Sequence, residues 1–140
     1  ADYLLIIGEG EEKFKLQKVI NYLNCEKSVF LLGFKKNVYN YLNRCQTFIS
    51  VAEYEDPGFS LLEAAYLKKK IITSLVDNGP RDMKKNGNLC YFFNFNNEKS
   101  FLRALKNSKN KNIKKIKDAK LYADKFSILS HKYNLKKILI

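Results

Sequence analysis

Two glutamates flank a Pro-Gly turn, and they are the residues of this sequence best suited to hold a polar ligand. Glu55 precedes Pro57-Gly58, and Glu63 follows it within an almost wholly apolar run, 59–65. A buried carboxylate without a partner is strongly destabilising unless its pKa shifts until it is neutral. We therefore expect a partner opposite Glu63, and we interpret that partner as a ligand.

The Pro57-Gly58 turn predicts a site for an anionic group such as a phosphate. An apolar run, 47–51, comes before it and predicts a strand, whereas the run after it predicts a helix. Open parallel sheets bind ligands beyond the carboxyl ends of their strands, and the first amides of a helix lack partners. Because Gly58 permits close backbone approach, a phosphate could lie against the amides of Gly58, Phe59 and Ser60.

The two carboxylates would flank this phosphate. An ionised carboxylate is purely an acceptor with several lone pairs, so it suits the vicinal hydroxyls of a sugar. Glu55 would face the group attached on the outer side, and Glu63 would face the nucleoside side. The pattern predicts recognition of a sugar on one side and of a ribose on the other.

A second glycine turn, Gly8-Glu9-Gly10, follows the apolar run 3–7 but does not fit a dinucleotide site. The fingerprint Gly-x-Gly-x-x-Gly requires a third glycine where this sequence has Lys13. The glutamates between positions 9 and 12 would also repel a diphosphate. We interpret this turn as a tight turn followed by an acidic helix start.

Strands and helices are predicted to alternate along residues 3 to 97, which is typical of an α/β fold. We predict a Rossmann-like, doubly wound parallel sheet with C-terminal helices, in a single domain over residues 3–139. The run 3–7 is expected to be buried on both faces, and Tyr39 and Leu42 are expected to point inward. The predicted strands are 3–7, 28–32, 47–51, 70–74 and 89–93. The predicted helices are 11–24, 38–44, one after Pro57-Gly58, one after Asn78-Gly79-Pro80, one around 101–105 ended by the polar cluster 107–110, one over 113–126, and 128–139.

Composition excludes several classes of protein. No apolar run approaches the roughly 18 residues of a membrane span, and no secretory signal is present, so we expect a cytoplasmic chain. Cys25, Cys45 and Cys90 are widely spaced, with His131 as the sole histidine, so we expect reduced thiols and neither a disulfide framework nor a metal site.

The net charge of +12 is concentrated at the C-terminal end. Residues 99–140 hold thirteen basic and two acidic residues, whereas residues 1–98 are nearly balanced. Such a segment can be a solvated helical face, or it can attach to an anionic membrane surface or to nucleic acid. The alternative function is thus a non-catalytic Rossmann-like binding module with a basic tail for membrane or nucleic acid.

Three stretches together resemble the C-terminal, donor-binding domain of the family 4 (group 1) glycosyltransferases. They are 5–10, 30–34 and Glu55 to Glu63 with the following Ala64-Ala65, in that order. The resemblance covers about residues 3 to 139. It implies the GT-B architecture of two Rossmann-like domains and a retaining, hexosyltransferase-type reaction that uses a nucleoside-diphosphate sugar without metal or cofactor.

The resemblance also implies roles for individual residues. Glu55 would be catalytic, holding the hydroxyls of the donor sugar beside the reacting carbon, and Glu63 would bind the ribose. The segment of Gly58, Phe59 and Ser60 would cradle the diphosphate. The nucleobase would be bordered by Phe34 and Lys35, mainly through main-chain contacts, and by Gly8.

This sequence departs from the family pattern at Asp56-Pro57, where a small residue and an aromatic are common. Pro57 lacks an amide proton, and Asp56 adds negative charge near the expected phosphate. The resemblance further implies that the basic phosphate clamp and the acceptor domain lie outside this chain, which would be inactive alone. The expected partners are the nucleotide-sugar donor and a glycan or lipid-linked acceptor, and no nucleic acid is expected. The expected location is the cytoplasm, with a peripheral position at the inner membrane surface.

Overall fold

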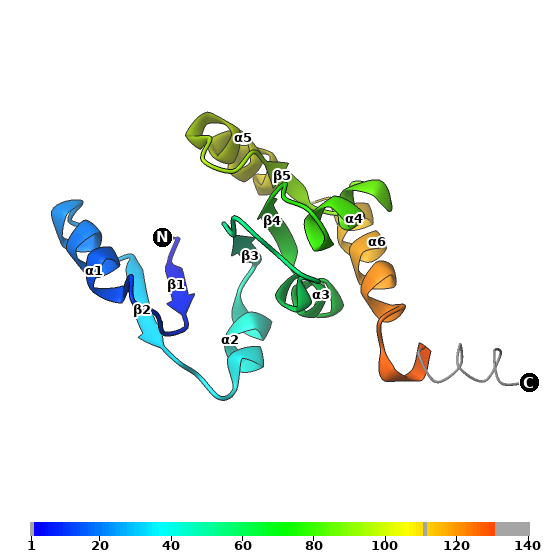
Figure 1. Cartoon of the computed structure of the whole chain (residues 1–140), viewed down its shortest axis with the longest axis horizontal. Coiled ribbons are helices and arrows are strands. Elements are labelled where there is room, and N and C mark those ends of the chain that lie inside the picture. Colours follow the sequence, from blue (N-terminus) through cyan, green and yellow to red (C-terminus); the bar gives the residue numbers. More distant parts are fainter. Residues whose placement is uncertain (1, 111, 131–140) are drawn as a thin grey trace, which may run out of the picture. The chain divides into compact units, whose positions relative to one another are not determined.

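A computed structural model describes residues 2–110 and 112–130, which form an α/β protein with parallel strands (Figure 1). The expected α/β class and all five predicted strands are confirmed. The chain divides into two compact units, Ala1–Tyr41 and Leu42–Ile140. The elements are β1 (Leu4–Ile7), α1 (Lys13–Tyr22), β2 (Val29–Gly33), α2 (Val38–Arg44), β3 (Thr47–Ser50), α3 (Phe59–Tyr66), β4 (Lys70–Ser74), α4 (Gly79–Lys85), β5 (Tyr91–Phe93), α5 (Glu98–Lys109) and α6 (Ile113–Asp124).

The first unit contains a parallel pair of strands, β1 and β2, and the helix α1. Leu4 pairs with Val29, and the register shifts by one residue between Ile6 and Ile7. The expected burial of β1 on both faces is wrong, because Leu4 and Leu5 are exposed in the structure. Among the described strands β1 has only β2 as a neighbour, and α1 buries a single residue, Ile20.

The helix α2 has the predicted bounds, but only one of its two expected core residues is buried. Leu42 is buried in the main hydrophobic cluster of the second unit. Tyr39 is exposed, so its predicted inward position is wrong. A tyrosine ring accepts such a position because its hydroxyl end is polar.

The second unit is built on a three-stranded parallel sheet in the order β3-β4-β5. Successive side chains of a strand point to opposite faces, and the neighbours Ile71 and Ile72 enter different clusters. The cluster around Ile71 includes α3 and α6, whereas the cluster around Ile72 includes α5. Helices therefore cover both faces of this sheet, as the doubly wound prediction requires.

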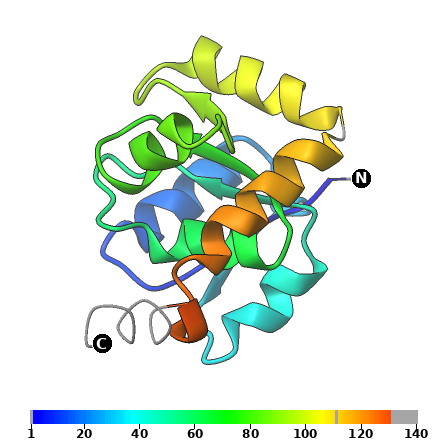
Figure 2. The ribbon, with the colours of Figure 1, turned by 90° about the vertical axis from the view of Figure 1, so that its right-hand side faces the viewer.

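The helix α6 packs closely against α3, and it crosses that helix in Figure 2. Small residues make the close approach possible, since Ala64 and Ala65 of α3 and Ala119 and Ala123 of α6 are buried in one cluster. The side chain of Lys115 also ties α6 to the start of β5, donating hydrogen bonds to the carbonyl oxygens of Asn88 and Cys90.

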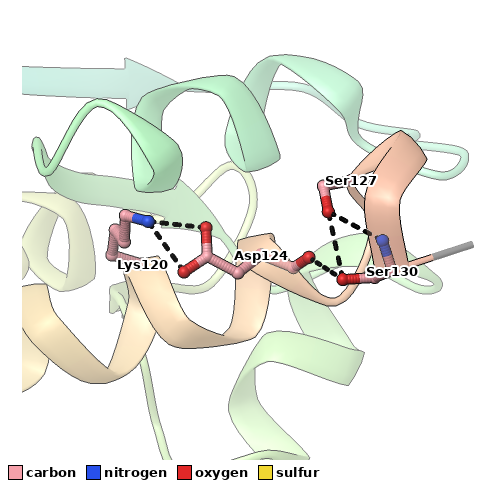
Figure 3. Close-up of polar contacts among 4 residues, drawn as sticks. All are labelled: Lys120, Asp124, Ser127 and Ser130. Carbon is pink, nitrogen blue, oxygen red and sulfur yellow. Dashed lines mark hydrogen bonds and ion pairs between the residues drawn. The ribbon is translucent and has the colours of Figure 1, made fainter. Parts of the chain in front are cut away.

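A polar network closes the C-terminal end of α6 (Figure 3). Lys120 Nζ contacts both carboxylate oxygens of Asp124 at 2.6 and 2.7 Å. Ser130 Oγ donates to the Asp124 carbonyl at 2.8 Å, and Ser127 Oγ accepts from the Ser130 amide at 3.2 Å. A new helical turn thus starts after Ser127, although most of the predicted helix 128–139 lies outside the described residues.

One detail of the C-terminal prediction is wrong. The helix α5 runs through Asn107 and Ser108 to Lys109, because Ser108 is buried and its hydroxyl donates to the Leu105 carbonyl at 2.7 Å. The predicted helix 113–126 corresponds to α6, whose Ala119 and Ala123 are buried.

Replacing Leu61 with alanine should destabilise the fold strongly. Leu61 is 0% exposed, and deleting a buried leucine side chain costs about 2–5 kcal/mol. The control is Leu102→Ala, because Leu102 is 51% exposed and its loss should change the free energy of unfolding by less than about 1 kcal/mol. Urea unfolding followed by circular dichroism measures both, and equal losses would contradict the described core.

Candidate functional site

The loop after β3 leads into α3 through a glycine in the left-handed conformation. Gly58 has φ 82° and ψ 47° and lies at the N-cap position, where a glycine has no side chain to cap the helix. A Cβ atom at Gly58 would lie 3.1 Å from Leu61 Cδ1. The amides of Leu61 and Leu62 donate to the Gly58 carbonyl. The amides of Gly58, Phe59 and Ser60 precede them, at the helix end where amides have no intrahelical acceptor and can donate to a ligand.

One predicted carboxylate is attached to this helix start. Ser60 Oγ donates a hydrogen bond of 3.4 Å to Glu55 Oε1, and both residues are half-buried. Glu63 follows Ser60 by three residues and so lies on the same side of α3. The structure therefore brings Glu55, Ser60 and Glu63 to one side of the first two turns of α3.

The expectation that Glu63 is buried and lacks a partner within the protein is wrong. Glu63 is half-buried rather than enclosed, and it has an interaction within the protein. The apolar run around it is explained by α3 packing, since Leu61, Ala64 and Ala65 are the buried residues of that helix. Burial of its charge therefore does not call for a ligand.

A pocket of about 190 Å³ lies on another side of α3. It contains neither Glu55, Ser60 nor Glu63. Its lining residues come from the loop before α3, from α3, from the start of α4 and from the end of α6: Asp56, Pro57, Gly58, Phe59, Leu61, Leu62, Asn78, Gly79, Asp82, Met83, Tyr122 and Phe126. The carboxylates of Asp56 and Asp82 make the interior of this pocket unfavourable for a phosphate.

Asp56 was expected to add negative charge, and the structure gives that charge a local partner. Tyr54 donates from its hydroxyl to Asp56 Oδ2 at 3.2 Å. The nearby Asp56 carboxylate, with this hydrogen bond, raises the pKa of Tyr54. The tyrosine thus stays neutral and can keep donating to Asp56 at neutral pH.

The loop between β4 and α4 supports the Pro57-Gly58 turn. A Cβ atom at Gly79 would collide with the Pro57 carbonyl oxygen and would lie 3.4 Å from Gly58 Cα. Two residues further on, Arg81 pairs with Asp77, with 2.6 Å between Nε and Oδ1. Sequence reasoning assigned no role to Arg81, although its place just after the Asn78-Gly79-Pro80 turn would have identified a cation on a ligand-binding edge.

The first unit brings together the residues that were expected to border a nucleobase. The Gly8 amide donates to the Gly33 carbonyl at 3.0 Å, so the loops after β1 and β2 are neighbours. Phe34 is exposed and Lys35 is half-buried on the second of these loops. Both loops lie at the carboxyl edge of the pair of strands, where α/β folds bind ligands.

Within residues 2–110 and 112–130 no group of three His, Cys, Asp or Glu residues could hold a metal ion. The three cysteines are free thiols, and burial raises the pKa of Cys90 to about 12. Nor does any helix in the described part of the chain have the length and apolar character needed to cross a membrane.

The family described as "Glycosyl transferases group 1" has a sequence model that matches residues 3–136. An uncharacterized glycosyltransferase of Methanocaldococcus jannaschii is 36% identical over 80 residues, or 57% of this chain and 20% of that protein. A poly(ribitol-phosphate) alpha-N-acetylglucosaminyltransferase of Staphylococcus aureus is 34% identical over 65% of this chain and 19% of its own length. An N-acetylgalactosamine-N,N'-diacetylbacillosaminyl-diphospho-undecaprenol 4-alpha-N-acetylgalactosaminyltransferase of Campylobacter jejuni is 32% identical over 74% of this chain and 28% of its own length.

Solved structures show the same fold. The crystal structure of HepE from Anabaena in complex with UDP and glucose aligns with a TM-score of 0.81 at 17% identity, over 98% of this chain and 40% of that one. The crystal structure of TarM aligns with a TM-score of 0.72 at 26% identity, over 95% of this chain and 28% of that one. This chain spans between a fifth and two fifths of the proteins it matches.

Replacing Gly79 with alanine should destabilise the loop before α3. The added Cβ meets backbone atoms of Pro57 and Gly58 that cannot rotate away, so a loss of about 1–3 kcal/mol in the free energy of unfolding is expected. Gly10→Ala is the control, because its Cβ meets nothing within 4 Å. Denaturant unfolding compares the two variants, and equal stability would contradict the described packing.

Proposed function

Because this chain belongs to the group 1 glycosyltransferases, we propose that it is the donor-binding part of a retaining glycosyltransferase. The substrate is a nucleoside-diphosphate sugar, from which a sugar is transferred to a glycan or lipid-linked acceptor. One observation carries the proposal: the Glu55 carboxylate is held by Ser60 at a helix start whose N-cap residue is a glycine. Such a start offers amide donors for a diphosphate beside a carboxylate that accepts from sugar hydroxyls.

The chemistry assigned to this site is stabilisation of charge. When the bond between the anomeric carbon and the diphosphate oxygen breaks, positive character develops on the sugar and negative charge on the leaving diphosphate. The amides of Gly58, Phe59 and Ser60 stabilise the leaving group, as preorganised donors do in other sites. Glu55 orients the sugar hydroxyls beside the reacting carbon. We assign no step to a metal or cofactor.

Two further sets of residues are assigned to the nucleoside in this proposal. Glu63 accepts from the ribose hydroxyls, on the same side of α3 as Ser60. Gly8, Phe34 and Lys35 border the base on the loops after β1 and β2. Support comes from HepE, a structural neighbour whose crystals contain UDP and glucose.

The acceptor class is proposed from the relatives. The names of two of them specify poly(ribitol-phosphate) and a diphospho-undecaprenol sugar as what they act on. A glycan or lipid-linked acceptor therefore fits this chain, and a lipid-linked one would require work at a membrane surface. We propose a cytoplasmic enzyme that is peripheral at the inner membrane.

Glu63→Ala should weaken the affinity of this chain for UDP, GDP or ADP about tenfold, because charge-assisted hydrogen bonds to the ribose are lost. Glu53→Ala is the matched control, since Glu53 is an exposed glutamate on the same loop as Glu55. Isothermal titration calorimetry measures both. Absence of binding by the unaltered chain at millimolar nucleotide, or equal binding by Glu63→Ala, would contradict the proposed site.

In the full-length enzyme, Glu55→Gln should lower turnover about a hundredfold while donor affinity changes much less. The reason is that interactions strengthened in the transition state affect kcat more than binding. Steady-state kinetics with a labelled sugar donor separate kcat from donor KM. An unchanged kcat would refute the role given to Glu55.

A second candidate function is attachment of the basic helices to an anionic membrane. On α5 the four cations Lys99, Arg103, Lys106 and Lys109 are all exposed, and their spacing places them on one face with the exposed Leu102. On α6, Lys114 and Lys117 are exposed together with Leu121, and Lys125 is exposed at the end of this helix. Apolar side chains among lysines favour a lipid surface over nucleic acid, for which aromatic platforms would be expected.

The double variant K99E/K106E tests this surface. It should weaken binding of the chain to vesicles containing anionic phospholipid by about tenfold or more, since each cation near such a surface contributes about 1 kcal/mol. The control is K84E/K85E, which changes the same charge on the exposed side of α4. Vesicle sedimentation at two salt concentrations measures the effect. Equal binding by both variants indicates a solvated face, and tighter binding to an oligonucleotide favours nucleic acid.

A further inference from the structure

In the first unit one carboxylate joins the loops that follow β1 and β2. The backbone amide of Phe34 donates to Glu9 Oε1 at 3.3 Å, across 25 residues of sequence. Lys13 Nζ donates to both oxygens of the same carboxylate, at 3.1 and 3.2 Å. These hydrogen bonds lower the pKa of Glu9, with the larger contribution from Lys13 and a smaller one from the Phe34 amide. The Glu9 carboxylate is therefore an ionised acceptor at neutral pH.

The last residue of β2, Gly33, lies directly against this carboxylate. Gly33 has φ 68°, and a Cβ atom there would lie 2.5 Å from Glu9 Oε1. The Gly8 amide bonds to the Gly33 carbonyl immediately beside it. Glycine at position 33 thus leaves the space that the glutamate occupies, and the two loops are held at two adjacent points.

Stability alone does not explain the arrangement. The side chains of Glu9 and Lys13 are 53% and 51% exposed, and an exposed ion pair at i and i+4 contributes little to folding. The bond to Phe34 is different, because it fixes a main-chain group of a loop rather than a second side chain. This hydrogen bond therefore restricts the backbone conformation of residues 34 and 35.

We infer that Glu9 is a positioning residue for the nucleobase, holding the Phe34-Lys35 loop in the shape that receives the base. The inference rests on the proposed function, which places the base at this loop. It also predicts which bases fit. Since the Phe34 amide already donates to Glu9, main-chain recognition by Phe34 falls to its carbonyl oxygen, which accepts no hydrogen bond from the described residues.

A carbonyl acceptor matches a base that presents a ring N–H group. Uracil and guanine have such a donor, whereas the corresponding ring nitrogen of adenine or cytosine is an acceptor. Two acceptors that face each other leave both without a donor, and the resulting preference is moderate here because Phe34 is exposed. We therefore expect a uridine or guanosine diphosphate sugar as the donor, since adenine offers this carbonyl only its exocyclic amino group.

The test compares Glu9→Ala, Glu9→Gln and the control Glu12→Ala, using UDP, GDP and ADP as probes. Glu12 is a suitable control because it pairs with Lys15 on the same helix start, with 2.7 Å between Nζ and Oε1. The unaltered chain should bind UDP or GDP about tenfold more tightly than ADP. Glu9→Ala should bind UDP or GDP about tenfold more weakly than the unaltered chain does, and its preference for these nucleotides over ADP should be smaller. Its melting temperature should be unchanged.

Glu9→Gln should keep most of the nucleotide affinity, because its side-chain amide oxygen still accepts from the Phe34 amide. Glu12→Ala should bind nucleotide as tightly as the unaltered chain does. Amide hydrogen exchange at Phe34, read by NMR without any nucleotide, should accelerate in Glu9→Ala alone. The inference would be overturned if Glu9→Ala left both the nucleotide affinity and the amide hydrogen exchange at Phe34 unchanged while Glu63→Ala weakened binding. The proposed function would then still stand. A preference of the unaltered chain for ADP would overturn the assigned bases, and no nucleotide binding at all would overturn both proposals.

Discussion

The close packing of Gly79 against the Pro57-Gly58 turn is the constraint on which the candidate site depends. The space between these backbones does not admit a Cβ atom, so the loop after β4 determines where the loop after β3 can run. That loop in turn delivers Gly58 to the start of α3 in a left-handed conformation. Because β3 and β4 are parallel, the loops that follow them lie at the same edge of the sheet. The first amides of α3 and the Glu55 carboxylate lie at this edge.

Carboxylates lie on both sides of the start of α3, so the binding of an anion there depends on the helix amides. Asp56 and Asp82 line the pocket that lies beside Pro57 and Gly58, and like charge disfavours a diphosphate there. On the other side, Ser60 donates to Glu55 and no lysine or arginine is needed to hold the carboxylate. A donor that places its phosphates on the amides and its hydroxyls on Glu55 avoids both aspartates.

Local chemistry made much of the fold and part of the site predictable. Apolar runs predicted every strand, two of them ended by glycine, and the turn at Pro57-Gly58 predicted that a helix begins after it. The environments of Glu63 and Tyr39 could not be predicted, because burial depends on which face of a helix meets the core. The bond from Phe34 to Glu9 was equally hidden, since it joins groups 25 residues apart and has no periodic signal.

The two candidate ligand-binding edges use their glycines differently, and the difference explains why sequence motifs identify one better than the other. At Gly79 a Cβ atom would collide with the Pro57 backbone, and Gly58 has a φ of 82°, which together leave a readable Pro-Gly pattern. At Gly33, with a φ of 68°, the neighbouring space is filled by the side chain of Glu9, so a glycine lies beside a distant acid. Neither residue alone distinguishes such a pair from an ordinary turn and a solvated glutamate. Only the fold, by setting β1 and β2 in parallel register, brings the carboxylate to the amide it holds.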